Sequence, residues 1–183
     1  QQIQNPSAKR QAVLDFAMNC GVFHDVGIIN FISLFTRTAR QWFDEEYEIT
    51  QLHTIVGNKR LATCASTRAY AAAALGHHSW YDGSHGYPET YKRLTCPCRQ
   101  MVDVIGLIDW LDNSISRAWL YGHTKRNFDE AIRAALLLEG KRFSPLLTAR
   151  LRDKAIVEKL RQRFVSARLE AYGQLYEAEN CAP

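Results

Sequence analysis

Histidine and aspartate side chains recur along this chain at intervals that could assemble a metal site. The chain has six histidines, and four of them form an ordered pattern with two aspartates. The pattern consists of His24, Asp25, His53, His77, His78 and Asp109. Successive blocks are separated by about the length of one helix plus a turn. In a helical bundle such residues can project inward at one level, and bundle cores host metal sites built in this way.

Imidazole and carboxylate ligands together suit iron, manganese, zinc or nickel ions. A single tetrahedral ion cannot use six side chains, whereas two ions with bridging oxygens can. Two ions ~3.5–4 Å apart are a recurring arrangement for attack on phosphorus. Taken singly, His53 could be an ordinary helix histidine, and His77 and His78 could be a surface pair. Asp109 lies in the apolar run Ile105–Leu111, where a buried carboxylate needs a partner. The set of six therefore favours a binuclear centre.

Helices must position these residues, because apolar residues recur at three- and four-residue steps along most of the chain. We expect helices over residues 5–21, 22–30, 44–57, 58–75, 100–117 and 153–176, with a short one opening at Ser144-Pro145. Another helix should start at Asn127 or Asp129 and end at about Glu139. No segment has the alternation typical of a strand. The span 79–98 contains Asp82-Gly83 and Pro88, which predicts a long loop. Such loops in compact domains are usually functional. The predicted fold class is all-α, with one domain over residues 1–183.

The net charge, the apolar runs and the cysteines of the chain indicate which kinds of partner and which location to expect. The formal net charge is +4, which is too mild to argue for binding duplex nucleic acid but is compatible with a small anionic ligand. Many of the basic residues fall between Lys141 and Arg168, where we expect a solvated helix face. No apolar run approaches the ~20 residues that a membrane span needs, so no membrane segment is expected. Five scattered cysteines without a CxxC pair indicate a reducing, cytoplasmic location.

Three blocks of sequence make the pattern specific. Phe23-His24-Asp25-Val26-Gly27 resembles the signature of the HD superfamily of metal-dependent phosphohydrolases. Residues 77–88, His-His-Ser-Trp-Tyr-Asp-Gly-Ser-His-Gly-Tyr-Pro, are similar to the signature of its HD-GYP branch. Asp109-Trp110-Leu111-Asp112-Asn113 matches the third block of that branch, and His53 matches its intermediate histidine. The resemblance spans about residues 12–150 and implies an HD-domain helical bundle with a Gly-Tyr-Pro site loop.

The resemblance also implies roles for individual residues. By this resemblance, the six residues of the His/Asp pattern are metal ligands, and Asp25 bridges two divalent transition-metal ions. Iron or manganese is expected first, with zinc or nickel as alternatives. Tyr87 and Pro88 line the substrate site, and Arg117 resembles a family arginine that faces substrate phosphate. The implied activity is hydrolysis of a cyclic dinucleotide, cyclic di-GMP. Family members usually join this module to regulatory or sensory segments, and a homodimer through the last helix is possible.

Three departures from the family pattern keep alternatives open. No histidine precedes His24, whereas the family usually has one a helix earlier. Because the chain begins at Gln1, we expect that its first helix and amino-terminal part are absent. Ile28 stands where the family commonly has a lysine, and His85 is an extra loop residue. The alternatives are a degenerate signalling receptor with the same fold, or an HD-superfamily phosphohydrolase for another nucleotide.

Overall fold

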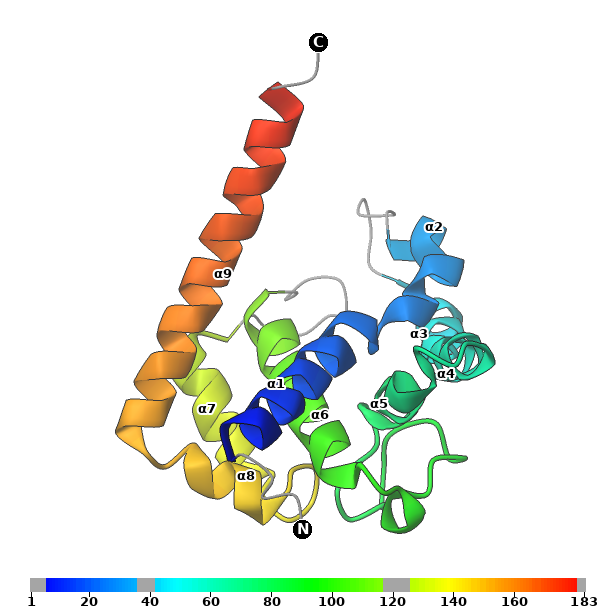
Figure 1. The fold of residues 1–183 in the computed structure, drawn as a ribbon, viewed down its shortest axis with the longest axis horizontal. Helices are drawn as coiled ribbons and strands as arrows, with labels where there is room; N and C mark the ends of the chain where they lie inside the picture. The colour runs from blue at the N-terminus through cyan, green and yellow to red at the C-terminus, as the bar shows by residue number, and fades with distance from the viewer. Residues whose placement is uncertain (1–5, 36–41, 117–125, 181–183) are drawn as a thin grey trace.

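The computed structural model describes residues 6–35, 42–116 and 126–180. Within these ranges the chain is helical and contains no strand, which confirms the all-α class. The elements in chain order are α1 (Pro6–Phe23), η1 (Val26–Phe31), α2 (Ile32–Phe35), α3 (Asp44–Gln51), α4 (His53–Thr63), η2 (Arg68–Tyr70), α5 (Ala71–Gly76), η3 (Arg93–Thr95), α6 (Arg99–Ser116), α7 (Phe128–Leu137), α8 (Pro145–Arg150) and α9 (Lys154–Asn180). Here η marks a 3₁₀ helix. Figure 1 shows α1 and α6 crossing the middle of the molecule, with α9 along one side.

Local chemistry explains where several helices begin. Asn127 caps α7: its side chain accepts a hydrogen bond from the Glu130 backbone N–H, and the Glu130 carboxylate accepts one from the Asn127 N–H. Acidic residues occupy the first turn of α3, where their negative charges interact favourably with the helix dipole. Pro145 opens α8, where a missing N–H costs nothing. These starts agree with the sequence expectations.

The expected boundary at Gly57 is wrong. Residues 44–63 form two helices, α3 and α4, that meet at Leu52, and Gly57 lies inside α4. Gly57 does not end a helix; it allows η1 to pack closely against α4. The facing residue in η1 is Gly27, where an added Cβ atom would lie 2.0 Å from the carbonyl oxygen of His53 and 2.7 Å from the backbone N of Gly57. The two backbones therefore touch, and this contact holds η1 against the start of α4.

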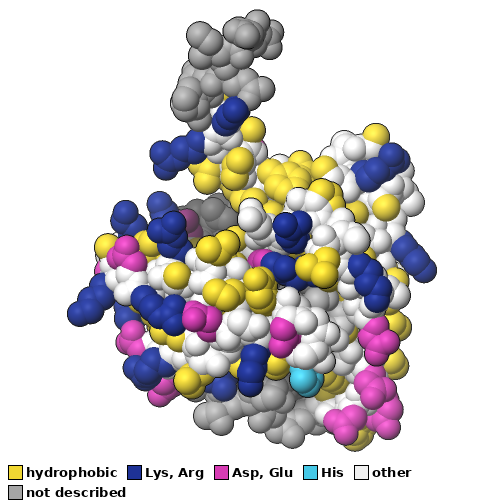
Figure 2. All heavy atoms as spheres, turned by 90° about the horizontal axis from the view of Figure 1, so that it is seen from below, with side chains coloured by type: hydrophobic (Ala, Val, Ile, Leu, Met, Phe, Trp, Pro, Cys, Tyr) yellow, Lys and Arg dark blue, Asp and Glu magenta, His cyan; other side chains and the backbone are white. Residues whose placement is uncertain are grey.

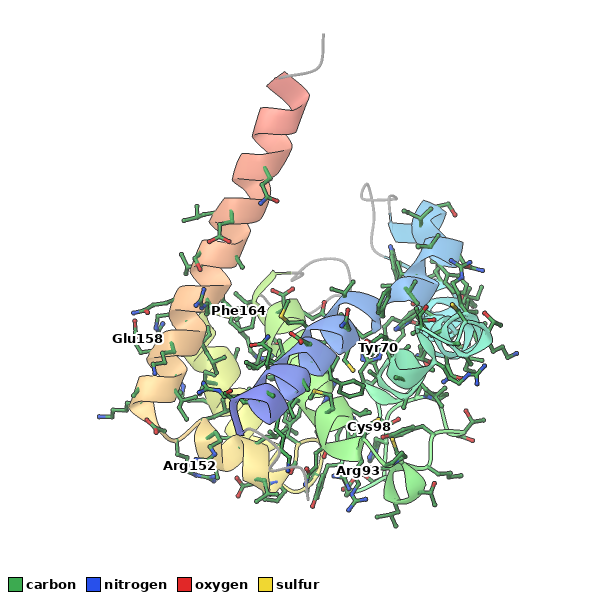
Figure 3. The ribbon with its side chains drawn as sticks, in the orientation of Figure 1. Tyr70, Arg93, Cys98, Arg152, Glu158 and Phe164 are labelled. Carbon is green, nitrogen blue, oxygen red and sulfur yellow. The ribbon has the colours of Figure 1, made fainter. Side chains whose placement is uncertain are left out.

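Apolar packing falls into one large cluster and two small ones. The large cluster joins the second half of α6 to α7, α8 and the start of α9, through Leu107, Leu111, Ala131, Ile132, Ala135, Phe143 and Leu151. Phe164 of α9 packs on this cluster, with its ring centroid 5.9 Å from that of Phe128 (Figure 3). The small clusters lie around Tyr70, where α1 meets α5 (Figure 3). Beyond its packed start, α9 continues away from the other helices (Figure 1).

The segment Ser7–Leu34 is apolar enough and long enough to cross a membrane, by length and composition alone. This is weak evidence, because the core helix of a soluble protein or a signal sequence passes the same test. Several of its apolar side chains are exposed, among them Met18 and Val22. The same segment contacts α5 and α6 and supplies two residues of the predicted site.

On the face drawn in Figure 2, basic side chains are spread among acidic ones rather than gathered in one patch.

Candidate metal centre

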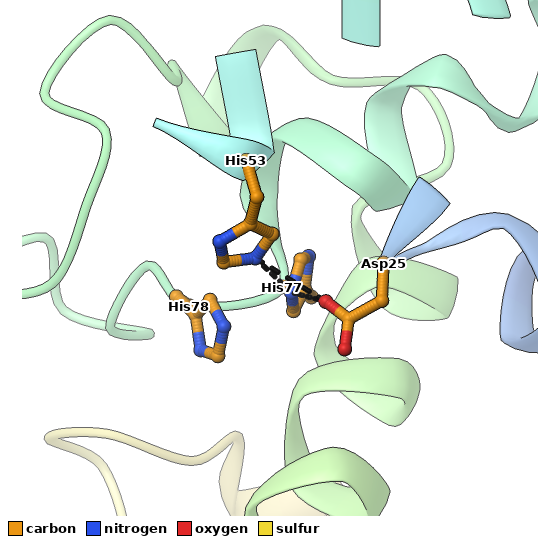
Figure 4. A group of neighbouring side chains, drawn as sticks. All are labelled: Asp25, His53, His77 and His78. Carbon is orange, nitrogen blue, oxygen red and sulfur yellow. Dashed lines mark hydrogen bonds and ion pairs between the residues drawn. The ribbon is translucent and has the colours of Figure 1, made fainter. Parts of the chain in front are cut away.

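The structure brings all six patterned residues together. His24 and Asp25 follow the end of α1, His53 is the first residue of α4, His77 and His78 follow α5, and Asp109 lies within α6. Figure 4 shows Asp25 facing His53 and His77, with His78 beside them. Each of these elements places its site residue at or near a helix end, apart from Asp109. The site is therefore formed where α1, α4 and α5 end or begin against the middle of α6.

Short distances join these side chains through the two carboxylates. Asp25 Oδ1 lies 3.2 Å from His53 Nε2 and 3.4 Å from His77 Nε2. His24 Nε2 lies 3.5 Å from Asp25 Oδ2 and 3.6 Å from Asp109 Oδ1. His78 Nδ1 lies 3.8 Å from Asp109 Oδ2. Two groups of ligand atoms result, each with its members within 4.8 Å of one another: Asp25, His53, His77 and His78 in one, and His24, Asp25 and Asp109 in the other. Asp25 is common to both.

Backbone carbonyls fix the tautomers of three histidines. His53 Nδ1 lies 2.6 Å from the carbonyl oxygen of Thr50, and His24 Nδ1 lies 2.7 Å from that of Gly21. His77 Nδ1 is similarly placed, 3.0 Å from the carbonyl oxygen of Ala73. A carbonyl oxygen only accepts, so each Nδ1 carries the hydrogen and donates it. In the neutral rings, each Nε2 is then left with a lone pair directed into the site. This is the arrangement that metal-binding histidines adopt.

These lone pairs converge on a carboxylate oxygen that has no hydrogen-bond donor. His53 Nε2 and His77 Nε2 lie 3.3 Å apart, and both approach Asp25 Oδ1. Although the distances are short, Asp25 Oδ1 is buried without a hydrogen-bond partner. A buried polar atom left in this state is costly. A cation among these three atoms removes that cost, so the residues fit a bound metal ion.

Burial and neighbouring charges shift three of the site's pKa values. Burial opposes ionisation of Asp25, but the facing histidines outweigh it and hold the pKa of this carboxyl well below its usual range. Burial would lower the pKa of His24, yet the facing carboxylates of Asp109 and Asp25 raise it to about 9. Burial, together with His77 and His53, lowers the pKa of His78 well below its usual value. His78 is therefore neutral, as a ligand must be.

Asn113 and the loop after α5 complete the surroundings of the site. The Asn113 side-chain amide donates a hydrogen bond of 2.8 Å to Asp109 Oδ1 and so orients this carboxylate. The Tyr87 ring centroid lies 4.6 Å from that of His78 and 6.2 Å from that of His53. Half-buried Pro88 follows it through a cis peptide bond. Tyr87 is thus beside the cluster.

Two other predicted residues have different outcomes. His85 is exposed, its ring lies 4.6 Å from that of Trp80, and it belongs to neither ligand group, which agrees with an inserted loop residue. Arg117 lies outside the described residues. Arg142 was not predicted as a site residue. It was grouped with a solvated basic stretch, but it is half-buried beside the site. A possible signal was its place next to Phe143 in a turn that follows α7.

Comparison with known proteins adds no relative to this picture. No protein-family model matches the chain, and no curated protein matches it either. The geometry of the site and the motifs in the sequence are therefore the evidence for a function.

Proposed function

We propose that this chain is an HD-GYP-type phosphodiesterase that hydrolyses a cyclic dinucleotide, cyclic di-GMP, at a binuclear metal site. One observation carries the proposal: six residues predicted from sequence motifs converge from four separate segments into two ligand groups that share Asp25. A shared carboxylate between two ligand groups is the arrangement needed to hold two ions close together. The HD-domain bundle and the function of the Gly-Tyr-Pro loop belong to the same proposal.

The chain's own residues would divide the work as follows. His53, His77 and His78 would hold one ion, His24 and Asp109 the other, and Asp25 both. When bound, the ions supply a nucleophile from water at neutral pH and offset charge on the phosphoryl oxygens. Asn113 keeps Asp109 in position through its hydrogen bond. Tyr87, whose ring lies beside His78, offers a surface against which a base or ribose can pack.

A second candidate is a receptor that binds a cyclic dinucleotide without cleaving it. Ile28, half-buried in η1, motivates it, because an uncharged side chain stands where the family commonly places a phosphate-binding lysine. An HD-superfamily phosphohydrolase for another nucleotide is a further form of the same chemistry. The Gly-Tyr-Pro sequence of the loop argues for the cyclic dinucleotide.

The test is hydrolysis of cyclic di-GMP by the chain loaded anaerobically with iron or manganese, with products separated by chromatography. The proposal predicts linear dinucleotide or GMP, and no product from protein kept in chelator. Intact substrate with two ions bound per chain would contradict the enzyme and favour the receptor or another nucleotide. A panel of other nucleotides under the same conditions separates those two outcomes.

A further inference from the structure

A short turn after α7 carries an arginine to the edge of the metal centre. The turn spans Glu139 to Phe143, and Gly140 adopts a φ of 73°, which L side chains rarely adopt. The Gly140 backbone N–H donates to the Phe143 carbonyl at 2.9 Å and closes the turn. The Glu139 carboxylate accepts hydrogen bonds from Arg152 and Thr148, which fix it to the following helix. Arg142 lies in this closed turn.

The turn is attached to the loop that follows the site histidines. The Tyr81 N–H donates to the Arg142 carbonyl oxygen at 3.1 Å, and the Asp82 N–H donates to that of Lys141 at 3.0 Å. These two bonds hold the backbone of Arg142 against the segment that begins with His77 and His78. The position of Arg142 is therefore tied to the site through main-chain contacts.

Aromatic rings surround the side chain of Arg142. Its Cζ atom lies 5.7 Å from the ring centroid of Trp110, 5.8 Å from that of Trp80 and 5.7 Å from that of Phe143. Burial lowers the pKa of this guanidinium, while Tyr87 and Asp109 act in the opposite direction. Arg142 and His77 line the same small pocket. Arg142 therefore lies at the edge of the site.

Arg142 differs from the arginines that form ion pairs. Arg93 pairs with Asp103, Arg152 with Glu139, and Arg161 with Asp129. Within the described ranges, no carboxylate lies within ion-pair distance of Arg142. Arginine stays charged when buried, and a buried charge without a counter-ion is costly. An anion at the site would meet this need, and the guanidinium fork suits two oxygens of one phosphate.

We propose that Arg142 binds the non-bridging oxygens of a phosphate group held at the metal centre. This inference rests on the proposed function for its substrate, a phosphodiester, and it specifies which side chain receives that group. It also gives the site a cation where Ile28 supplies none. Arg142 would act by binding and orienting the phosphate, not by transferring a proton.

The test is binding of inorganic phosphate to the manganese-loaded full chain, measured by calorimetry, for wild type, Arg142→Gln, Arg142→Lys and Arg150→Gln. Arg150 is exposed on α8, and its substitution removes the same charge. We expect Arg142→Gln to weaken phosphate binding about 10- to 100-fold, the effect of one or two charge-assisted hydrogen bonds. Arg142→Lys should have a smaller loss, and Arg150→Gln should match wild type. Metal content is measured alongside.

Each outcome bears on the inference separately from the enzyme assignment. Equal phosphate affinity in Arg142→Gln and Arg150→Gln, at full metal content, would overturn the inference even if cyclic di-GMP is hydrolysed. A weakened affinity confined to the Arg142 variants would support it even if cyclic di-GMP is left intact. If Arg142→Gln does not fold, the Arg142→Lys comparison decides, because this variant keeps the charge and the stem but loses the fork. Unchanged affinity in that variant would then contradict the inference.

Discussion

The candidate metal centre and the large apolar cluster both use residues of α6, but different interactions hold their side chains together. Around Leu111, side chains from α7, α8 and α9 bury apolar surface, and Leu111 and Ala135 are 0% exposed. Around Asp25, imidazole nitrogens and a carboxylate oxygen point at one another. The first arrangement is stable as it stands. The second leaves a buried oxygen without a donor.

This difference predicts which part of the fold would depend on a bound metal ion. Burial of apolar surface is favourable whatever is bound. Converging lone pairs are unfavourable until a cation joins them, so the free energy of metal binding becomes folding free energy there. The helices α1, α4 and α5, which meet around small residues such as Gly27 and Ala74, should therefore respond to metal far more than α7 to α9.

Replacing Asp25 with alanine should have the largest effect. Asp25 belongs to both ligand groups, so Asp25→Ala should reduce hydrolysis about a thousandfold or more, since several kcal/mol of metal-dependent stabilisation of the transition state is lost. The fold should survive, because no apolar contact is removed. Activity and circular dichroism measure the two effects. Asp15→Ala, an exposed change on α1, is the control, and retained turnover in Asp25→Ala would sink the assignment.

Replacing Leu111 with alanine should weaken the apolar cluster and leave the metal centre intact. Leu111 is fully buried, so the free energy of unfolding should fall by about 2–5 kcal/mol. The loss should be equal with and without metal, because it belongs to the region that does not depend on metal. Urea unfolding in both conditions measures it. Leu137→Ala, at a residue 84% exposed, should change stability by less than about 0.5 kcal/mol.

Removing metal should loosen the site helices selectively. At a free metal concentration about 1,000 times Kd, binding adds about 4 kcal/mol to the free energy of unfolding. Chelation should therefore increase amide hydrogen exchange in α1, α4 and α5, with little change in α7 and α8. Exchange followed by mass spectrometry resolves these segments. A uniform increase over all helices would show that the two regions unfold as one unit and would remove the contrast.

The smallest expected effect is the pH dependence of the metal-free chain. The pKa of His24 is raised from 6.5 to about 9, so its contribution to stability is fully present below pH 6.5 and is lost as the pH rises through 9. The contribution amounts to about 3 kcal/mol. In chelator, wild type should lose more stability than His24→Gln between pH 6.5 and 9.5. His85→Gln is the control and should behave as wild type; a wild-type loss no larger than that of His24→Gln would contradict this role.

The sequence predicted the members of the His/Asp cluster better than it predicted helix boundaries. His53 and Asp109 could be picked out because metal-binding motifs need particular residue types at a set spacing. Gly57 was misread because glycine both ends helices and permits close packing, and its partner Gly27 is brought near only by the tertiary fold. Arg142 could not be predicted, because its contacts with Trp80 and Trp110 join segments far apart in sequence.

The most direct test of the central claim is the number of metal ions bound per chain, measured by mass spectrometry of the elements after dialysis. The account predicts two ions for wild type, one for Asp109→Asn, and none or nearly none for Asp25→Ala, because Asp25 is common to both ligand groups. Asp112→Asn, on the same helix and outside both groups, should retain two. Two ions retained by Asp25→Ala, or no ion bound by wild type, would contradict the shared metal centre.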